Sequence, residues 1–242
     1  PYERTAGDAD QAHEDSLNDV CAVLERPGLK PKAKLDALAE SMTRCRDRFR
    51  AVPADYSEPR PLVGVVGEIF CRLNTFSNED LIRRIEAQGG EGWLSDITEW
   101  VWYTNFETFK RIRAAGKQVS LSMLGAVVKN KIQRRDEHAL VGMLHDDLVG
   151  YEEPADISTV LDHAMPYLPH YGALGEMVLS VGKAIYLYHQ GADGIVDISP
   201  FTCMNGITCE AVYPRVSAEH DNIPIKNFYF DGTQKDLDTA VG

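Results

Sequence analysis

The sequence predicts an α/β protein, in which a small parallel flavodoxin-like sheet is interrupted by a large helical insertion and preceded by a helical hairpin. Three observations predict this class. Short apolar runs rich in β-branched residues, typical of buried parallel strands, occur near residue 65 and again after residue 190. A long stretch of helical periodicity separates them, and two amphipathic segments precede the first run. We expect two domains, 1–60 and 61–242, with the helical insertion at 97–190.

The hairpin is predicted from two helical segments, residues 6–26 and 31–51, followed by a Pro-rich linker at 52–61. Each segment has apolar residues at helical spacing, which are Leu17, Val20, Cys21 and Leu24 in the first and Leu35, Leu38, Met42, Cys45 and Phe49 in the second. Because free cysteines are frequently buried, we expect Cys21 and Cys45 to pack between the helices.

The sheet is predicted from four strands, at residues 62–67, 93–94, 194–198 and 223–230. A helix at 79–88 joins the first two strands as a βαβ unit, and a helix at 207–219 joins the last two. Loops are expected at 68–78, 199–205 and 231–234. A flavodoxin-like strand order of 2-1-3-4 places the first and third strands side by side.

Charge and cysteine usage narrow the class of protein. The chain has 25 Lys and Arg against 37 Asp and Glu, a net charge of −12, which argues against nucleic-acid binding. No apolar run reaches the roughly 18 residues of a membrane span, so we expect no membrane partner.

Five cysteines with long spacings and no CxxC pair favour a reducing, cytoplasmic setting. The chain starts without Met and ends at Val241-Gly242, which predicts a piece of a longer protein.

The candidate site follows from the position of two cysteines. Ligands of open α/β sheets bind at the carboxyl ends of the strands, at the switch point in strand order. Cys71 and Cys203 follow the first and third strands, and a helix N-terminus nearby lowers a thiol pKa and favours the thiolate that iron or zinc requires. The alternative is two structural cysteines. Cys209 lies within the next predicted helix, and we expect it to be buried in the hydrophobic core. Further polar contacts are expected from Glu68, Asn74, Asn78, Ser199, Thr202 and Asn205.

Three stretches of the sequence resemble a known family. They are residues 64–78 (GVVGEIFCRLNTFSN), 93–105 (WLSDITEWVWYTN) and 194–207 (GIVDISPFTCMNGI). They resemble the large CoA-substrate-specific enzyme activases, which are related to the activators of 2-hydroxyacyl-CoA dehydratases, in the accessory region outside the actin-like ATPase domains. The resemblance covers roughly residues 60–242. No ATPase signature occurs in this chain.

The resemblance implies electron transfer through an iron–sulfur cluster that cysteines matching Cys71 and Cys203 help to hold. The family site needs at least a third cysteine, which we expect upstream of residue 1. The implied partners are the ATPase part of the same protein or a partner subunit. We therefore predict that the isolated chain folds but carries no iron, since clusters take three or four cysteines. Both loop thiols should be accessible, with Cys203 the more reactive.

Two alternatives remain open at this stage. Residues 136–182 contain nine acidic residues and no Lys or Arg, which is typical of a solvated helical face. The same pattern also suits a non-catalytic docking module that holds a basic partner subunit through the helical insert. A nucleotide or flavin site at the switch point is the weaker alternative, because the loop at 73–76 is bulkier than a phosphate-binding loop.

Overall fold

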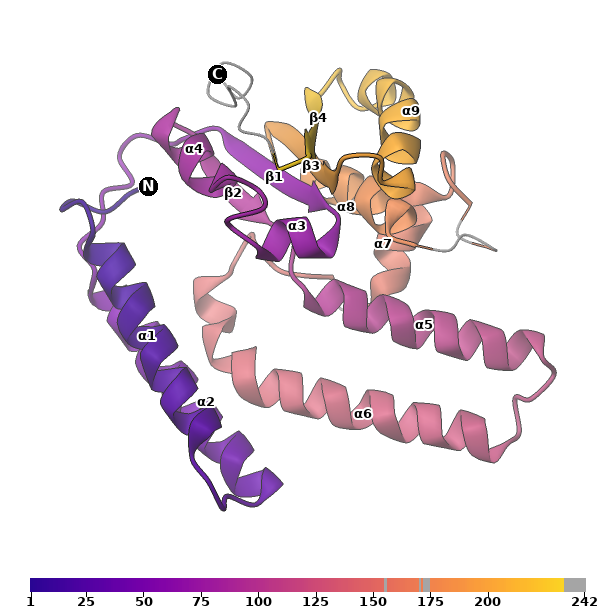
Figure 1. The fold of residues 1–242 in the computed structure, drawn as a ribbon, viewed down its shortest axis with the longest axis horizontal. Helices are drawn as coiled ribbons and strands as arrows, with labels where there is room; N and C mark the ends of the chain where they lie inside the picture. Colours follow the sequence, from indigo (N-terminus) through magenta and orange to yellow (C-terminus); the bar gives the residue numbers. More distant parts are fainter. Residues whose placement is uncertain (155, 170, 172–174, 233–242) are drawn as a thin grey trace. The chain divides into compact units, whose positions relative to one another are not determined.

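The structure is a computed structural model that describes residues 1–154, 156–169, 171 and 175–232 (Figure 1). Its contacts divide the chain into two compact units, each built from separate stretches of sequence. The sheet unit consists of Pro1, Arg60–Phe106 and Glu153–Gly242, and the helical unit of Tyr2–Pro59 and Glu107–Glu152. The N-terminal hairpin therefore groups with part of the insertion, a grouping that the sequence patterns do not indicate.

A four-stranded parallel sheet organises the sheet unit. Its strands are β1 (Leu62–Gly67), β2 (Glu91–Leu94), β3 (Gly194–Pro200) and β4 (Ile225–Phe230), in the order β2-β1-β3-β4. The predicted fold class and the predicted strand order are both confirmed. β1 lies between β2 and β3, with Val65 opposite Leu94 on one side and opposite Val196 on the other. Its unbroken apolar sequence suits a central strand that is covered on both faces.

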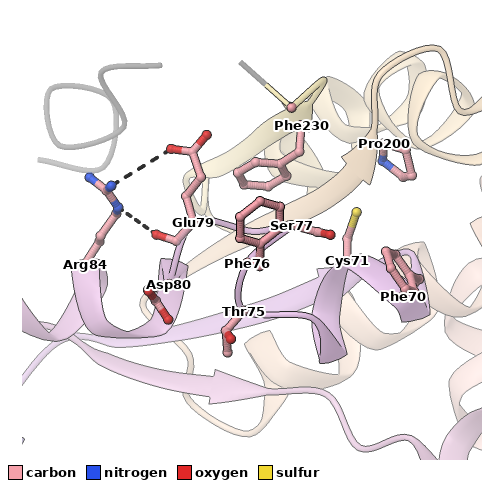
Figure 2. A pocket seen from close by; sticks show the side chains of 11 residues that line it. Phe70, Cys71, Thr75, Phe76, Ser77, Glu79, Asp80, Arg84, Pro200 and Phe230 are labelled. Atoms are coloured by element: carbon pink, nitrogen blue, oxygen red, sulfur yellow. Dashed lines mark hydrogen bonds and ion pairs between the residues drawn. The ribbon is translucent and has the colours of Figure 1, made fainter. Parts of the chain in front are cut away.

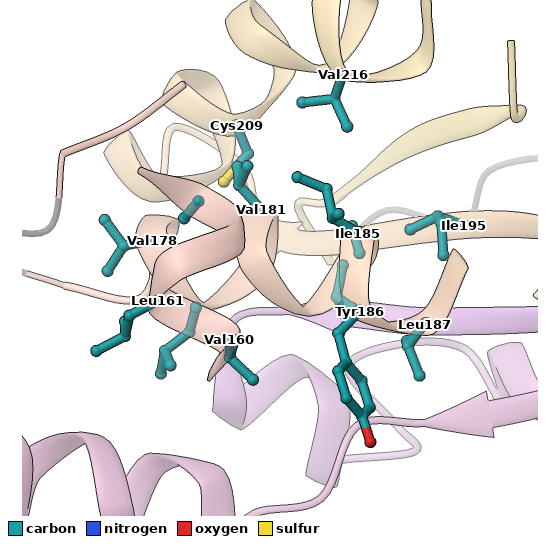
Figure 3. Close-up of a cluster of buried hydrophobic side chains, with 14 of the residues drawn as sticks. Val160, Leu161, Val178, Val181, Ile185, Tyr186, Leu187, Ile195, Cys209 and Val216 are labelled. Carbon is teal, nitrogen blue, oxygen red and sulfur yellow. The ribbon is translucent and has the colours of Figure 1, made fainter. Parts of the chain in front are cut away.

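Helices cover both faces of this sheet. They are α3 (Ile69–Leu73), α4 (Leu81–Ala87), α7 (Ile157–Ala164), α8 (Met177–His189), α9 (Met204–Glu219) and the first part of α5 (Thr98–Ala114). Val66 and Ile195 face a core shared with α7, α8 and α9, which Figure 3 shows from close by. Val65 and Val196 face the opposite core, which α4 covers. Alternate residues of one strand thus enter different cores, as the period of two requires.

The contact between α7 and α8 depends on a glycine. A Cβ atom at Gly182 would lie 2.0 Å from the Val160 carbonyl oxygen, so only glycine lets the two helix backbones approach this closely. The side chain one residue further along α8, Lys183, is fully buried and forms an ion pair with Glu153. α8 is therefore the central helix of this face, with apolar contacts on most sides.

The helical unit contains α1 (Asp8–Glu25), α2 (Pro31–Ala51), the end of α5, α6 (Leu121–Val141) and the 3-10 helix η1 (Gly142–Asp147). α1 and α2 form the predicted hairpin. Small side chains lie between them, and the Cys45 thiol donates a hydrogen bond to the Ser16 carbonyl oxygen at 3.7 Å. The Asp19 carboxylate accepts hydrogen bonds from Arg44 at 2.7 Å and from Arg48 at 3.0 Å.

The predicted apolar face of the first helix is wrong. α1 buries Ala12, Ser16 and Val23, whereas Leu17, Cys21 and Leu24 are exposed. Cys45 is buried as expected, but Cys21 is not. α1 therefore packs along the face with Ala12 and Ser16, and its Leu17 and Leu24 side chains lie on the exposed face. Among the described residues, no helix combines the length and apolarity that crossing a bilayer requires.

Candidate functional site at the carboxyl ends of β1 and β3

The candidate site begins where β1 ends beside β3. Gly67 has a φ of 117°, and a Cβ atom there would lie 2.1 Å from the Ile198 carbonyl oxygen, so glycine is required at this position. The next residue, Glu68, donates its N–H to the same Ile198 oxygen at 2.8 Å and caps α3. Its carboxylate accepts the Cys71 N–H at 2.9 Å. The predicted loop 68–78 therefore contains a short helix that the sequence analysis missed.

Cys71 lies on this short helix and is buried, with 2% of its surface exposed. Burial raises the pKa of its thiol to about 12, and the nearby Glu68, Cys203 and Glu176 side chains add to this effect. The expectations of an accessible thiol and of a lowered pKa are therefore wrong for Cys71. Carboxylates close to the sulfur and the loss of solvent outweigh the few N–H groups at the start of α3.

Cys203 precedes α9 as its N-cap residue and is partly exposed. Thr202 before it has a φ of 69°, which a β-branched residue rarely adopts. The turn is closed by a hydrogen bond from the Cys203 N–H to the Pro200 carbonyl oxygen at 3.0 Å. Because Cys203 contributes to the raised pKa of Cys71, the two sulfur-bearing side chains lie within electrostatic reach of each other.

Two carboxylates share this edge of the sheet. Glu176, just before α8, is buried and accepts the Ile69 N–H at 3.2 Å. Burial and then the charge of Glu68 raise the pKa of Glu176 to about 7, so its protonation changes near neutral pH. Glu176 could thus exchange a proton close to Cys71.

A buried ion pair lies behind Cys71. The Arg72 guanidinium contacts the Glu99 carboxylate at 2.7 Å and the Ser95 carbonyl oxygen at 3.1 Å, and both charged side chains are at least 95% buried. Burial raises the pKa of Glu99, and the attraction of Arg72 and Lys183 only partly offsets it. Neither Arg72 Nε nor Glu99 Oε2 has a hydrogen-bond partner among the described residues. Sequence reasoning named neither residue, because a charged pair 27 positions apart has no local pattern.

The structure gives each remaining predicted polar residue a place. Asn74 accepts the Ser77 N–H at 2.9 Å, and Asn78 donates to the Cys71 carbonyl oxygen at 2.7 Å, so both amides hold the loop around Cys71. Ser199 is buried against Gly206 in the first turn of α9. Asn205 packs against Gly175, and its Oδ1 atom is buried with no partner within the described part of the chain. A ligand-binding role for these four residues and for Glu68 stays a prediction.

A pocket of about 400 Å³ opens at the carboxyl ends of β1, β3 and β4 (Figure 2). Cys71 reaches it from α3, Pro200 from the end of β3 and Phe230 from the end of β4. Phe76 and Phe70 complete an apolar wall, while Glu79, Asp80 and Arg84 form a polar side. The pocket is thus lined by the Cys71 thiol and by aromatic side chains. It lies at the carboxyl ends of the strands, where ligands of open α/β sheets bind.

Cys209 does not belong to this site. It is fully buried in the core between α8 and α9, as predicted, and donates to the Met177 carbonyl oxygen at 3.5 Å. Beside it the buried Asp197 accepts a hydrogen bond from the Tyr213 hydroxyl at 2.5 Å. Burial raises the pKa of Asp197 to about 7 and also raises that of Cys209. A protonated thiol engaged in the core is a poor third ligand for a cluster near Cys71.

Among the described residues, two thiols come to this edge of the sheet. Within residues 1–154, 156–169, 171 and 175–232, no group of three or more His, Cys, Asp or Glu side chains is arranged to hold a metal ion. Cys71 and Cys203 are two thiols, and a cluster takes three or four. Comparisons with protein-family models, with curated proteins and with solved structures found no match.

Proposed function

We propose that this chain is an accessory component of an electron-transfer system and supplies Cys71 and Cys203 as two of the ligands of an iron–sulfur site. The carrying observation is that these cysteines follow β1 and β3, which are neighbours at the switch point of the sheet. Because the chain offers only two suitable thiols, the remaining ligands come from outside it. The resemblance to the activase accessory region supports this proposal, with the ATPase part or a partner subunit as the source.

Exposed apolar side chains lie close to both cysteines in sequence, which supports a site that a partner protein covers. After β1 the chain exposes Phe70 of α3 and Phe76, and after β3 it exposes Phe201 and, at the start of α9, Met204 and Ile207. Large apolar side chains that gather around a polar site are typical of a surface that a partner protein covers. Such a partner would exclude water from the two thiols and bring its own ligands to them.

A surrogate for the missing ligands makes the proposal testable on this chain. The chain is incubated anaerobically with ferric iron, sulfide and glutathione, whose thiol stands in for the partner's ligands, and bound iron and visible absorption are measured. We expect iron and a charge-transfer band only when glutathione is present. Cys71→Ser and Cys203→Ser should each abolish both signals.

The control is Cys21→Ser, which changes an exposed cysteine of the helical unit and should leave the iron content unchanged. Iron that survives in the double variant Cys71→Ser/Cys203→Ser would overturn the proposal. So would the absence of any iron with glutathione. Because metal binding must displace the proton of the Cys71 thiol, iron uptake should increase with pH.

The alternative of docking through the acidic segment 136–182 gains no specific support. Asp147 is paired with Arg50 at 2.7 Å, Glu153 is paired with Lys183, and Glu176 is buried at the candidate site. These three acids are used within their own units.

A further inference from the structure

The helical unit contains a helix whose apolar stripe faces solvent. α6 exposes Leu121, Leu124, Val128 and Ile132, which follow one another at the spacing of one helix face. Leu121 is 88% exposed and Leu124 is 58% exposed. The opposite face of α6 is less exposed although it is more polar, with Asn130, Gln133, Arg134 and Glu137. This is the reverse of the usual pattern of an amphipathic helix, and it indicates that another surface covers the stripe.

α1 has a second exposed stripe of the same kind. Leu17, Cys21 and Leu24 are exposed on one face, because the hairpin packs along the small residues of the other. Both stripes belong to the same unit, and both remain exposed within one copy of the chain.

The charges beside the two stripes are opposite. α1 contains six acidic residues and no Lys or Arg, whereas α6 contains four Lys and Arg and two acidic residues, one of which, Asp136, is paired with Arg135 at 2.6 Å. Asp10 and Glu14 are exposed on the stripe face of α1, and Lys131 and Arg135 are exposed on the stripe face of α6. Two copies of α6 would bring like charges together, so α6 does not suit pairing with itself.

The spacings of the two stripes match in the antiparallel direction. When Leu24 is placed opposite Leu121, Cys21 falls opposite Leu124 and Leu17 opposite Val128. The same alignment places Glu14 opposite Lys131 and Asp10 opposite Arg135. Apolar side chains then meet along the seam, and each acid meets a base at its end.

We propose that two copies of this chain associate through their helical units, with α1 of each copy packed antiparallel on α6 of the other. Such an exchange is reciprocal, so it closes as a two-fold dimer and buries all four stripes. A lipid surface suits α6 less well, because the stripe is narrow and α6 contains no aromatic residue.

Charge exchange between copies is the first test. Variant A carries Asp10→Lys and Glu14→Lys, and variant B carries Lys131→Glu and Arg135→Glu. We expect the wild type to have twice the mass of one chain by sedimentation equilibrium, and each variant alone to have the mass of one chain. An equimolar mixture of A and B should regain the double mass, because each contact between their copies joins opposite charges again. Circular dichroism establishes that both variants are folded.

Cysteine cross-linking tests the alignment itself. Leu124→Cys should form a disulfide-linked dimer with Cys21 of the other copy under mild oxidation, and Cys21→Ser should abolish that dimer. Ser122→Cys is the matched control, because Ser122 is exposed on α6 but lies off the stripe. A wild type that keeps the mass of one chain up to its solubility limit would overturn the proposal. Binding to phosphatidylserine vesicles that requires Lys131 and Arg135, without self-association, would assign α6 to lipid instead and equally refute it.

Discussion

Replacing the buried Asp197 with Asn should change how the stability of the sheet unit depends on pH. The pKa of this carboxyl rises from 3.8 to about 7 on folding, because burial disfavours the charged form. Between these values the folded chain holds a proton that the unfolded chain has released. The contribution of this carboxyl to stability is therefore highest below pH 4, falls as the pH rises toward 7, and is constant above it, with a total loss of about 4 kcal/mol.

The Asn variant cannot ionise, so this loss should disappear. Glu176 has the same sign, with a pKa raised from 4.5 to about 7. Near pH 5.5 the wild type should therefore lose about 1 kcal/mol more per pH unit than the variant does. Asn keeps an acceptor for the Tyr213 hydroxyl. Its amide N–H₂ must occupy the place of Asp197 Oδ1, which has no hydrogen-bond partner among the described residues, at a cost of about 1–3 kcal/mol. The variant should thus be less stable than the wild type at pH 4 and more stable at pH 8.

Urea unfolding followed by tryptophan fluorescence measures this effect. All three tryptophans, Trp93, Trp100 and Trp102, lie in the sheet unit with Asp197, so the signal reports on the relevant core. Asp162→Asn changes an exposed acid of α7 and should leave the pH profile unchanged. Parallel pH profiles for the wild type and Asp197→Asn would refute the reasoning, because they would show that the folded wild type holds no extra proton at Asp197.

Three further predictions concern packing and thiol access. Arg72→Met should lower the free energy of unfolding, measured in urea, by about 3–5 kcal/mol, because it leaves the Glu99 charge buried without a partner. The double variant Arg72→Met/Glu99→Gln should recover at least half of this loss, and equal stability of the single and double variants would contradict the prediction. Gly182→Ala should lower the free energy of unfolding, because a Cβ at this position meets the Val160 carbonyl oxygen. Gly125→Ala is the control: its Cβ meets open space, so alanine should stabilise α6 by up to about 1 kcal/mol, a change several-fold smaller than the loss at Gly182. Ellman titration of the native chain should find two thiols that react fast, Cys21 and Cys203. The other three, Cys45, Cys71 and Cys209, should react only after denaturation. A fast reaction that Cys71→Ser removes would contradict the burial of Cys71.

The strands of the sheet were predictable from sequence because a buried parallel strand has a distinctive composition. Residues 62–67 and 194–198 are short, apolar and rich in β-branched residues, and both lie within a residue or two of the observed β1 and β3. The strand order followed from a general rule of α/β topology, and it brought Cys71 and Cys203 to the same edge.

The environment of the site was not predictable, since it depends on residues far apart in sequence. Glu176 reaches Cys71 from the end of the insertion, and Arg72 meets Glu99, which lies 27 positions further along the chain. These partners decide the pKa values, and no local spacing shows them. The prediction of the buried face of α1 was wrong for a related reason. Periodicity indicates which residues share a helix face, but not which face packs against the neighbouring helix.

The division of both units into separate stretches has a consequence for synthesis. The helical unit is complete in sequence once Glu152 has been made, whereas the sheet unit gains its third strand only at Gly194–Pro200. A growing chain can therefore complete its helical unit before its sheet unit, and until β3 is made β1 has one edge unpaired. During that interval Val65 and Val66 have no strand beside them on the β3 side, which makes this edge the place where a nascent chain is most exposed to wrong pairing.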